Sequence, residues 1–351
     1  MSYTKNQPGA IYAMTNQLTG NAVMAFTRAA DGTLTPAGTF PTGGFGNSRA
    51  GLVDPLGSQG ALILSADNRF LFAVNAASDE ISVFAVDEDR LTLIDIVASG
   101  GRQPVSLAHR EGLLYVLNAG GGIITGFTQG EDGRLTPLDG STQPVGVGPA
   151  VAAAQVGFTL DGSRLVVTEK LSGLIDTYAV DADGRAGPPL QTPSNGTVPF
   201  GFVVARDDLL IVVEGRFTEP SGAVSSYRVG TDGKLEVISG SVSSNQAASC
   251  WISINDPANP AYVYTSNTGA GSISGYAIGD DGTLSLLDPD GVTATTSDFP
   301  IDSAVADGQF LYVMNNGPST IEGFRIESDG SLTPITEVGG LPGGSQGIAA
   351  Y

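Results

Sequence analysis

The stretch "LYVLNAGGGIITGF" (114–127) reads as a strand, a Gly-rich polar turn and a second strand. Apolar, β-branched and aromatic residues on both sides of a turn-forming cluster are typical of a β-hairpin. The pattern recurs six more times along the chain, as "IYAMTNQLTGNAVMAF" (11–26), "LFAVNAASDEISVF" (71–84), "LVVTEKLSGLIDTY" (165–178), "LIVVEGRFTEPSGAVSSY" (210–227), "VYTSNTGAGSISGY" (263–276) and "LYVMNNGPSTIEGF" (311–324). The fold is therefore decided by how seven copies of one hairpin are assembled.

Each hairpin continues into a second turn signal, of which "DGRL" (132–135) is an example. Asp-Gly between apolar runs favours a tight hairpin, because the turn needs residues that tolerate a positive φ. A short apolar strand also precedes six of the hairpins, as "PVSLAH" (104–109) does here. Each unit thus predicts four antiparallel strands, named A to D in chain order. Four strands repeating every 40 to 60 residues or so are the signature of a β-propeller.

The two ends of the chain complete this arrangement. Seven units have strands B, C and D, but the first lacks a strand A, and "SQGIAAY" (345–351) can supply it. Such a closure pairs the edge strands that an open ring would expose. The sequence therefore predicts an all-β fold: a single seven-bladed propeller domain over residues 1–351, built of four-stranded antiparallel blades, in which residues 345–351 complete the N-terminal blade.

Composition limits the partners. The 351 residues carry a net charge of -20 with only 16 Lys and Arg, so the surface should repel nucleic acid and anionic membrane, and neither is expected as a partner. A single cysteine rules out an intramolecular disulfide. The N-terminal "MSYTKNQPGA" has no apolar core of a signal peptide. These features predict a cytoplasmic protein acting on a small molecule.

Antiparallel geometry places two sets of polar residues on one rim of the ring, where strand A begins and strand B ends. An inner set opens strand A and comprises Gln59, Gln103, Gln246 and Gln346. An outer set ends strand B and comprises Asn16, Asn75, Asn118, Glu169, Glu214, Asn267 and Asn315. Asn in such a place commonly caps a turn and tolerates a left-handed backbone. These residues are expected to surround the mouth of an axial channel.

Glu169 and Glu214 differ from the other members of the outer set, because Glu caps turns poorly. They fall in neighbouring blades, and a cation follows each of them: Lys170 directly and Arg216 two residues on. Carboxyls packed near a channel mouth can have raised pKa values and act as general acid or base. The cations could hold a substrate carboxylate or stabilise an oxyanion. The alternative is a pair of ion pairs that tie the fourth and fifth blades together.

Other residues expected near this mouth would bind the substrate. The long connection 41–57 brings Arg49, and Arg102 adjoins Gln103. Together they extend a substrate-binding set that also contains Gln59, Asn118, Gln246, Asn267 and Gln346. His109, the only histidine, falls on the opposite rim, so catalysis that needs two histidines or a Ser-His-Asp triad lacks its parts. Cys250 has no histidine base to activate it and is expected to be buried.

The repeated "LYVLN…I…F…DGRLTP" units resemble the seven-bladed lactonase family, which includes 6-phosphogluconolactonase and the fungal carboxymuconate lactonising enzyme. The resemblance covers essentially the whole chain. It implies an enzyme that opens or forms a lactone on a small carboxylated or sugar-derived substrate. Members typically carry a His-Pro pair near the start of a strand A, whereas this chain has "QP" (103–104) and "VP" (198–199). Glu169, Glu214 and Arg216 match the residue types of the family's channel mouth.

On this interpretation Glu214 is the general base and Glu169 its acid partner. Lys170 and Arg216 would stabilise the oxyanion or a substrate carboxylate, and Gln103 and Gln246 would position hydroxyls. No cofactor is required, but an alternative is a calcium ion held by Glu169, Glu214, Asn118 and Asn267, because oxygen-only ligands suit Ca²⁺. A further alternative is a non-catalytic binding or interaction propeller, since the fold hosts many such proteins.

Overall fold

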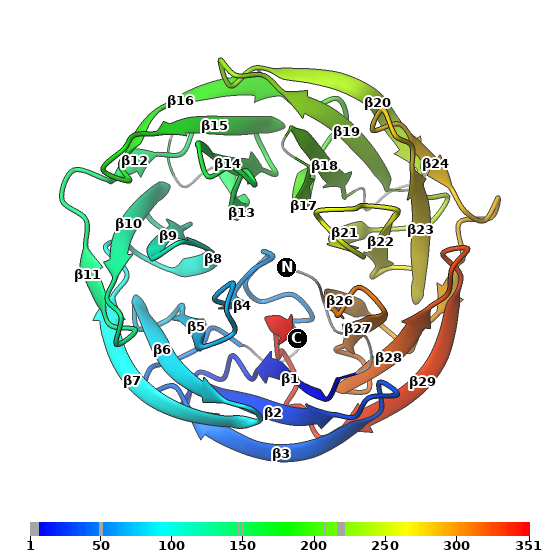
Figure 1. Cartoon of the computed structure of the whole chain (residues 1–351), viewed down its shortest axis with the longest axis horizontal. Coiled ribbons are helices and arrows are strands. Elements are labelled where there is room, and N and C mark those ends of the chain that lie inside the picture. Colours follow the sequence, from blue (N-terminus) through cyan, green and yellow to red (C-terminus); the bar gives the residue numbers. More distant parts are fainter. Residues whose placement is uncertain (1–6, 49–51, 147, 149–150, 207, 216–221) are drawn as a thin grey trace.

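The computed structural model describes residues 7–48, 52–146, 148, 151–206, 208–215 and 222–351. The strands form seven antiparallel sheets arranged in a ring around a central hub, as Figure 1 shows. From the hub outward, the first blade contains β30 (Ile348–Ala350), β1 (Gly9–Met14), β2 (Ala22–Arg28) and β3 (Leu34–Pro41). The second contains β4 (Leu62–Leu64), β5 (Phe70–Asn75), β6 (Glu80–Asp87) and β7 (Arg90–Ala98). The seven-bladed all-β prediction is confirmed.

The remaining blades follow the same order. The third contains β8 (Pro104–Arg110), β9 (Leu113–Asn118), β10 (Ile123–Gln129) and a divided outer strand, β11 (Leu135–Pro137) and β12 (Gln143–Pro144). The fourth has β13 (Ala153–Phe158), β14 (Arg164–Glu169), β15 (Leu174–Val180) and β16 (Ala186–Pro193), and the fifth has β17 (Pro199–Ala205), β18 (Leu209–Glu214), β19 (Ala223–Val229) and β20 (Leu235–Ser243). The sixth has β21 (Ser249–Ile254), β22 (Tyr262–Asn267), β23 (Ser272–Ile278), β24 (Leu284–Leu286) and β25 (Ala294–Thr295); the seventh has β26 (Pro300–Ala306), β27 (Phe310–Asn315), β28 (Thr320–Ile326) and β29 (Leu332–Gly339).

Burial explains why these segments form strands. The second strand of each blade is covered on both faces by neighbouring blades, so β5 and β18 are buried at every position and read as unbroken apolar runs. The outer strand β3 instead has most of its residues exposed or half-buried, because its far side meets solvent. None of the described segments is a helix of the length and apolarity needed to cross a membrane.

The C-terminal strand closes the ring. β30 pairs antiparallel with β1, with Ala349 opposite Tyr12, so it occupies the strand A position of the first blade. The buried guanidinium of Arg28 supports this closure, because its Nε donates to the Tyr351 carbonyl at 3.1 Å and it forms an ion pair with Asp307 of the seventh blade. The predicted role of residues 345–351 is therefore confirmed by strand pairing.

The connection between β3 and β4 reaches into the centre of the ring (Figure 1). The Ser58 carbonyl accepts hydrogen bonds from Trp251 Nε1 and Gln346 Nε2, both at 2.9 Å. The Gln59 amide then binds both backbone groups of Ile252, donating to its carbonyl at 2.7 Å and accepting from its N–H at 3.0 Å. This connection thus ties the second blade to the sixth blade and to the closing strand, and it fills the middle of the hub.

Asn75 and Asn118, at the ends of strand B in the second and third blades, join blades, whereas Asn16 has the left-handed backbone that the sequence suggested, with a φ of 54°. Asn75 is buried; its Nδ2 donates to Ser82 Oγ at 2.7 Å, and its Oδ1 accepts from Thr42 Oγ1 at 2.7 Å, where Thr42 follows the outer strand of the preceding blade. Asn118 Nδ2 likewise donates to the Ser99 carbonyl at 3.0 Å. The last side chain of strand B points into the seam between two blades, because the neighbouring connection passes directly over it.

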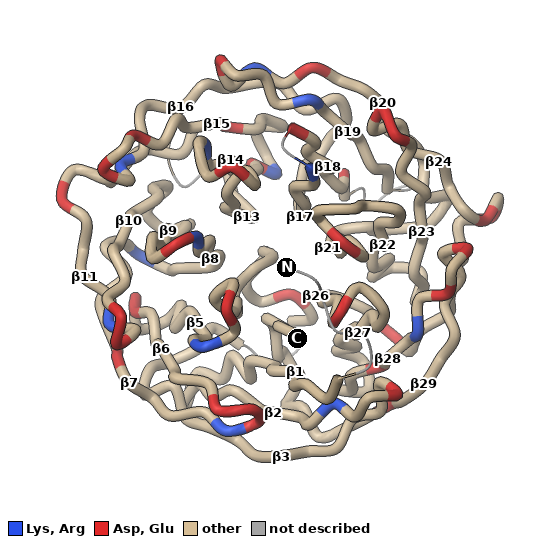
Figure 2. The backbone as a smooth tube through the Cα atoms, viewed as in Figure 1, with Lys and Arg blue, Asp and Glu red and all other residues tan. Residues whose placement is uncertain are grey.

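Charged residues are spread around the whole ring, with acidic residues outnumbering basic ones (Figure 2). Several acidic side chains stabilise the turn between the third and fourth strands of a blade. Asp31 is an example, because its Oδ1 accepts a hydrogen bond from the Thr33 N–H at 3.0 Å. This bond lowers the pKa of the exposed Asp31 carboxyl, together with a second bond from the Thr33 hydroxyl. Part of the large negative charge is therefore a consequence of turn chemistry.

Candidate functional site

Glu169 lies at the end of β14 and is fully buried in the seam between the third and fourth blades. Its Oε2 accepts a hydrogen bond from Ser172 Oγ, whereas its Oε1 has no donor among the described residues. Burial and the neighbouring Asp176 carboxyl together raise the pKa of Glu169 to about 7, against the lowering effect of Ser172. A proton on Glu169 makes its carboxyl a donor toward Asp176.

Asp176 was not among the residues singled out in the sequence. It is buried on β15 and accepts hydrogen bonds from Tyr178 Oη and Gln191 Nε2 at 3.1 Å and from the Gly146 N–H at 3.3 Å. These three donors hold the Asp176 oxygens beside the Glu169 carboxyl. One feature of the sequence could have identified Asp176. It lies two residues before Tyr178, the aromatic residue that ends the hairpin, whereas serine, such as Ser82 and Ser274, occupies the equivalent position in other blades.

Glu214 occupies the same place at the end of β18 but has different partners. Its buried carboxyl accepts from the Gly196 N–H at 2.9 Å, from Ser241 Oγ at 2.6 Å and from Ser225 Oγ. Gly196 follows the outer strand of the fourth blade, whereas Gly146 beside Glu169 follows that of the third. The two glutamates therefore lie in separate seams, and among the described residues no side chain or backbone group is hydrogen-bonded to both.

Lys170 points to the hub rather than into the seam. Its Nζ donates to the Gly57 carbonyl and lies 4.9 Å from the centroid of the Phe200 ring. Burial lowers the pKa of Lys170, and the charge of Asp54 opposes that effect. Lys170 thus lies near an acid from the β3–β4 connection. Two further predicted cations of this rim, Arg49 and Arg216, lie outside the described residues.

Asp54 was also missed, although its connection was expected to lie at this rim. It is half-buried, and its Oδ1 accepts from the Gly57 N–H and from Gln346 Nε2, both at 2.8 Å. Within the described part of the chain, no hydrogen bond reaches Oδ2. Desolvation raises the pKa of Asp54, while Lys170, Gly57 and Gln346 each lower it. One oxygen is therefore held in place and the other is free.

Gly57 lies where the acid and the amine approach each other. Its φ is +61°, and a Cβ built on it would lie 2.7 Å from Lys170 Nζ and 3.9 Å from Asp54 Oδ2. A side chain here would both strain the backbone and displace the ammonium group. The glycine thus leaves a small polar site at the hub, with a free carboxyl oxygen on one side and an ammonium on the other.

The four glutamines of the inner set divide into two pairs. Gln346 is fully buried in the hub, where it donates to Asp54 and accepts from the Leu56 N–H at 3.0 Å. Gln59, the other member of this pair, binds the backbone of Ile252. Gln103 and Gln246 stay at the rim: the Gln103 N–H donates to Asp79 Oδ1 at 2.7 Å, and Gln246 Nε2 donates to the Asp290 carbonyl at 2.8 Å.

Arg102, next to Gln103, is exposed, and its Nη2 donates to the Gly120 carbonyl at 3.0 Å. Cys250 is buried near the hub, and its burial raises the pKa of the thiol, with Asp54 adding to the effect. Such a thiol is protonated and a weak nucleophile.

The four residues of the alternative calcium set lie in four different blades. Asn267 is buried, and its Nδ2 donates to Ser274 Oγ at 2.8 Å, much as Asn75 binds Ser82. Among the described residues, no group of three or more His, Cys, Asp or Glu side chains could hold a metal ion. Calcium binding by Glu169, Glu214, Asn118 and Asn267 stays a prediction.

The fold and the hub define a seven-bladed propeller with a half-buried acid and amine where its strands A begin. Residues 12–148, less than half of the chain, match the family model described as "Lactonase, 7-bladed beta-propeller". The family resemblance that the repeats indicate is thereby confirmed. A comparison with curated proteins found no match.

Solved structures of similar fold cover nearly the whole chain. A Lactobacillus plantarum protein has a TM-score of 0.77 at 20% identity, covering 98% of this chain and 100% of that one. A Bacteroides fragilis protein described as a 6-phosphogluconolactonase has a TM-score of 0.74 at 20% identity, covering 99% of both chains. A periplasmic gluconolactonase of Pseudomonas aeruginosa has a TM-score of 0.71 at 16% identity, covering 98% of this chain and 99% of that one. At these identities the likeness concerns the fold.

Proposed function

We propose that this protein hydrolyses a small lactone at the hub, on the rim where strands B end. The observation that carries the proposal is the free Oδ2 of Asp54, which faces Lys170 across Gly57 in a half-buried place. The family match and the two neighbours described as a 6-phosphogluconolactonase and a gluconolactonase support the choice of a lactone. A sugar-derived or carboxylated lactone is the expected substrate class.

The chemistry follows from the two groups. Asp54 Oδ2 accepts a proton from a water molecule whose oxygen attacks the lactone carbonyl carbon. The ammonium of Lys170 stabilises the negative charge that develops on the carbonyl oxygen. When the tetrahedral intermediate collapses, the ring C–O bond breaks, and the proton on Asp54 passes to the departing ring oxygen. The product is an open hydroxy acid, and Asp54 returns to its starting state.

The structure gives Asp54 an advantage as a base over Glu214. A carboxyl that accepts three short hydrogen bonds in a closed seam has few lone pairs left for a water molecule, whereas Asp54 keeps one oxygen unengaged. The roles inferred from the sequence for Glu214, Glu169, Arg216, Gln103 and Gln246 stay predictions. Two alternatives remain. The first is an enzyme that forms a lactone by the reverse chemistry, and the second is a propeller that binds a ligand or partner without catalysis.

The test is hydrolysis of a lactone panel, including glucono-δ-lactone and 6-phosphoglucono-δ-lactone, followed as acid release at constant pH. Asp54→Asn keeps the shape and the Oδ1 contacts but removes the base, so kcat/KM should fall by about 10²–10⁴-fold. Asp139→Asn, an exposed acid of the outer edge, is the matched control and should retain full activity. Glu214→Gln in parallel tests the alternative base.

The pH dependence gives a second readout. The base must be deprotonated, so activity should fall as the pH drops through the raised pKa of Asp54. Wild-type protein that hydrolyses no lactone in the panel would favour the non-catalytic alternative. An Asp54→Asn variant that folds normally and is as active as wild type would remove Asp54 as the base.

A further inference from the structure

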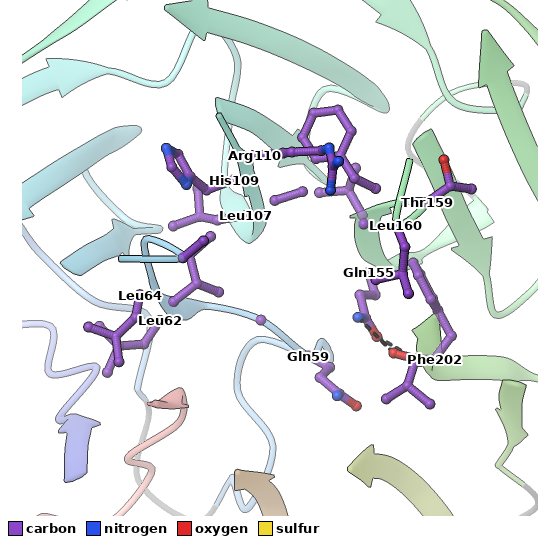
Figure 3. Close-up of a pocket in the computed structure, with 18 of the residues that line it drawn as sticks. Gln59, Leu62, Leu64, Leu107, His109, Arg110, Gln155, Thr159, Leu160 and Phe202 are labelled. Atoms are coloured by element: carbon purple, nitrogen blue, oxygen red, sulfur yellow. Dashed lines mark hydrogen bonds between the residues drawn. The ribbon is translucent and has the colours of Figure 1, made fainter. Parts of the chain in front are cut away.

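The opposite end of the hub is hollow. A cavity of about 500 Å³ opens on the rim where strands A end, and an adjoining hollow of about 360 Å³ shares Gln59, Ala66 and Val203 with it. We call the two together the funnel. In Figure 3 the Gln59 side chain lies among the cavity-lining residues that come from β4, β8, β13 and β17. Gln59, which is bound to Ile252 across the hub, lines both hollows, and the funnel has the size that small ligands occupy.

The funnel wall is mixed, with apolar side chains and polar groups in similar amounts. Leu62, Leu64, Leu107 and Phe202 surround it in Figure 3. The side-chain amide of Gln155 also lines the cavity, but it is already hydrogen-bonded: it accepts from the Phe202 N–H at 2.7 Å and donates to the Phe202 carbonyl at 3.0 Å. An occupant would therefore meet both apolar side chains and polar groups.

Asp302 is one of these polar groups. It lines the cavity from β26 with only 3% of its surface exposed. The Ser303 N–H donates to its Oδ1 at 3.1 Å, and the backbone N–H groups of Gly347 and Ile348 also favour its ionised form. Burial nevertheless raises its pKa to about 8, and the charge of Asp54 adds to the effect. In the part of the chain described, no Lys or Arg forms an ion pair with it.

The cations around the funnel mouth already have anionic partners. Arg110 pairs with Glu111 at 3.4 Å, and Arg69 pairs with Asp67 at 3.7 Å. Arg28 is bound to Asp307 at the edge of the adjoining hollow. Asp302 is thus an acid held by donors that suit a carboxylate but without a counter-charge, in a protein whose net charge of -20 attracts cations.

We propose that the funnel binds a small organic ammonium ion with an apolar body, whose charge pairs with Asp302 while its body packs against the half-buried Leu64, Leu160 and Val203. The site is separate from the Asp54–Lys170 end of the hub and does not depend on lactone hydrolysis. The neutral Asp302 carboxyl present before binding loses its proton to the solvent as the ammonium ion enters. Binding near neutral pH therefore releases a proton.

The probe is benzylamine, a cation at pH 7, and its neutral match of the same shape is benzyl alcohol. Titration calorimetry should show benzylammonium binding about 10-fold or more tightly than benzyl alcohol, the size expected for a charge-assisted hydrogen bond. Repeating the titration in two buffers of different ionisation heat should show proton release with benzylammonium only.

Three variants complete the test. Asp302→Asn should abolish the preference for the cation and the proton release, whereas Asp67→Asn, an exposed acid at the mouth, should leave both unchanged. Ala66→Trp, at an exposed position of the wall, should block both ligands even if Asp302→Asn proves unstable. Equal affinity for the two ligands, or cation binding that survives both Asp302→Asn and Ala66→Trp, would overturn the proposal.

Discussion

Glu169 and Glu214 occupy the same place in neighbouring repeats, yet their surroundings are opposite. Glu214 meets three donors, two serine hydroxyls and a backbone N–H, whereas Glu169 meets one serine hydroxyl and a second carboxyl. Both are fully buried in seams between blades. The comparison shows that the partners supplied by strand C and by the preceding blade, not the residue type at the end of strand B, decide how such a glutamate behaves.

The largest expected effect concerns pH and Glu169. Its folded-state pKa of about 7 exceeds the value of about 4.3 in an unfolded chain, so the folded state holds an extra proton between these values. The stabilisation from this group is fully present below about pH 4.3 and is lost as the pH rises through about 7, a change on the order of 3 kcal/mol. Glu169→Gln cannot titrate, so its stability relative to wild type should improve by about that amount over this range.

Urea unfolding of wild type and Glu169→Gln at several pH values from 4 to 8 measures this difference, and other titrating groups cancel because both proteins contain them. Asp176→Asn should also flatten the dependence, because it removes the carboxyl that raises the pKa of Glu169. A stability difference that stays constant across the range would contradict the proton on Glu169.

The next prediction compares the stability changes caused by Gln substitutions of the two glutamates at one pH. Glu214→Gln turns an NH₂ group toward Ser225, Ser241 or Gly196, all of which donate, so it should destabilise the fold by about 2 kcal/mol. At pH 4, where wild-type Glu169 is mainly protonated in the folded and the unfolded chain, Glu169→Gln should change stability by less than about 1 kcal/mol, because Gln resembles a protonated Glu and can donate to Asp176. Unfolding midpoints of the two variants give the comparison, and the reverse ranking would mean that the environments have been misassigned.

The smallest expected effect concerns the hydrogen bond from Ser172 to Glu169. Ser172→Ala removes the donor to Glu169 Oε2 at a cost of about 1 kcal/mol. Because that bond lowers the pKa of Glu169, the variant should also move the loss of stability to higher pH. Ser172→Thr, which keeps a hydroxyl, is the control. A transition that stays at the wild-type pH in Ser172→Ala would show that the hydroxyl does not influence the proton on Glu169.

The sequence predicted the fold because the information is local and repeated. Each blade needs only its own hairpins, so "LYVLNAGGGIITGF" and its copies specify four strands wherever they occur, and the spare segment 345–351 had one open edge to fill. The end of strand B was also placed correctly for Glu169 and Glu214, since hairpin register follows from the turn.

The site was harder to predict because it depends on contacts between distant parts of the chain. Asp54 lies in a connection without periodicity, and its partner Gln346 is 292 positions away. Lys170 directly follows Glu169 but points the other way, toward the hub, because successive side chains alternate at the end of a strand. The direction of each of these side chains depends on the assembled ring. The groups that the preceding blade places beside them depend on it too, so neither could be predicted from the local sequence.

The Gln59–Ile252 contact has a kinetic consequence. Since the Gln59 side chain spans the hub at this level, a molecule that passed from one rim to the other would have to displace it from Ile252. A reaction at the Asp54 end would have to discharge its product through the opening by which the substrate arrived, so each turnover would wait for departure, and accumulated product would inhibit competitively.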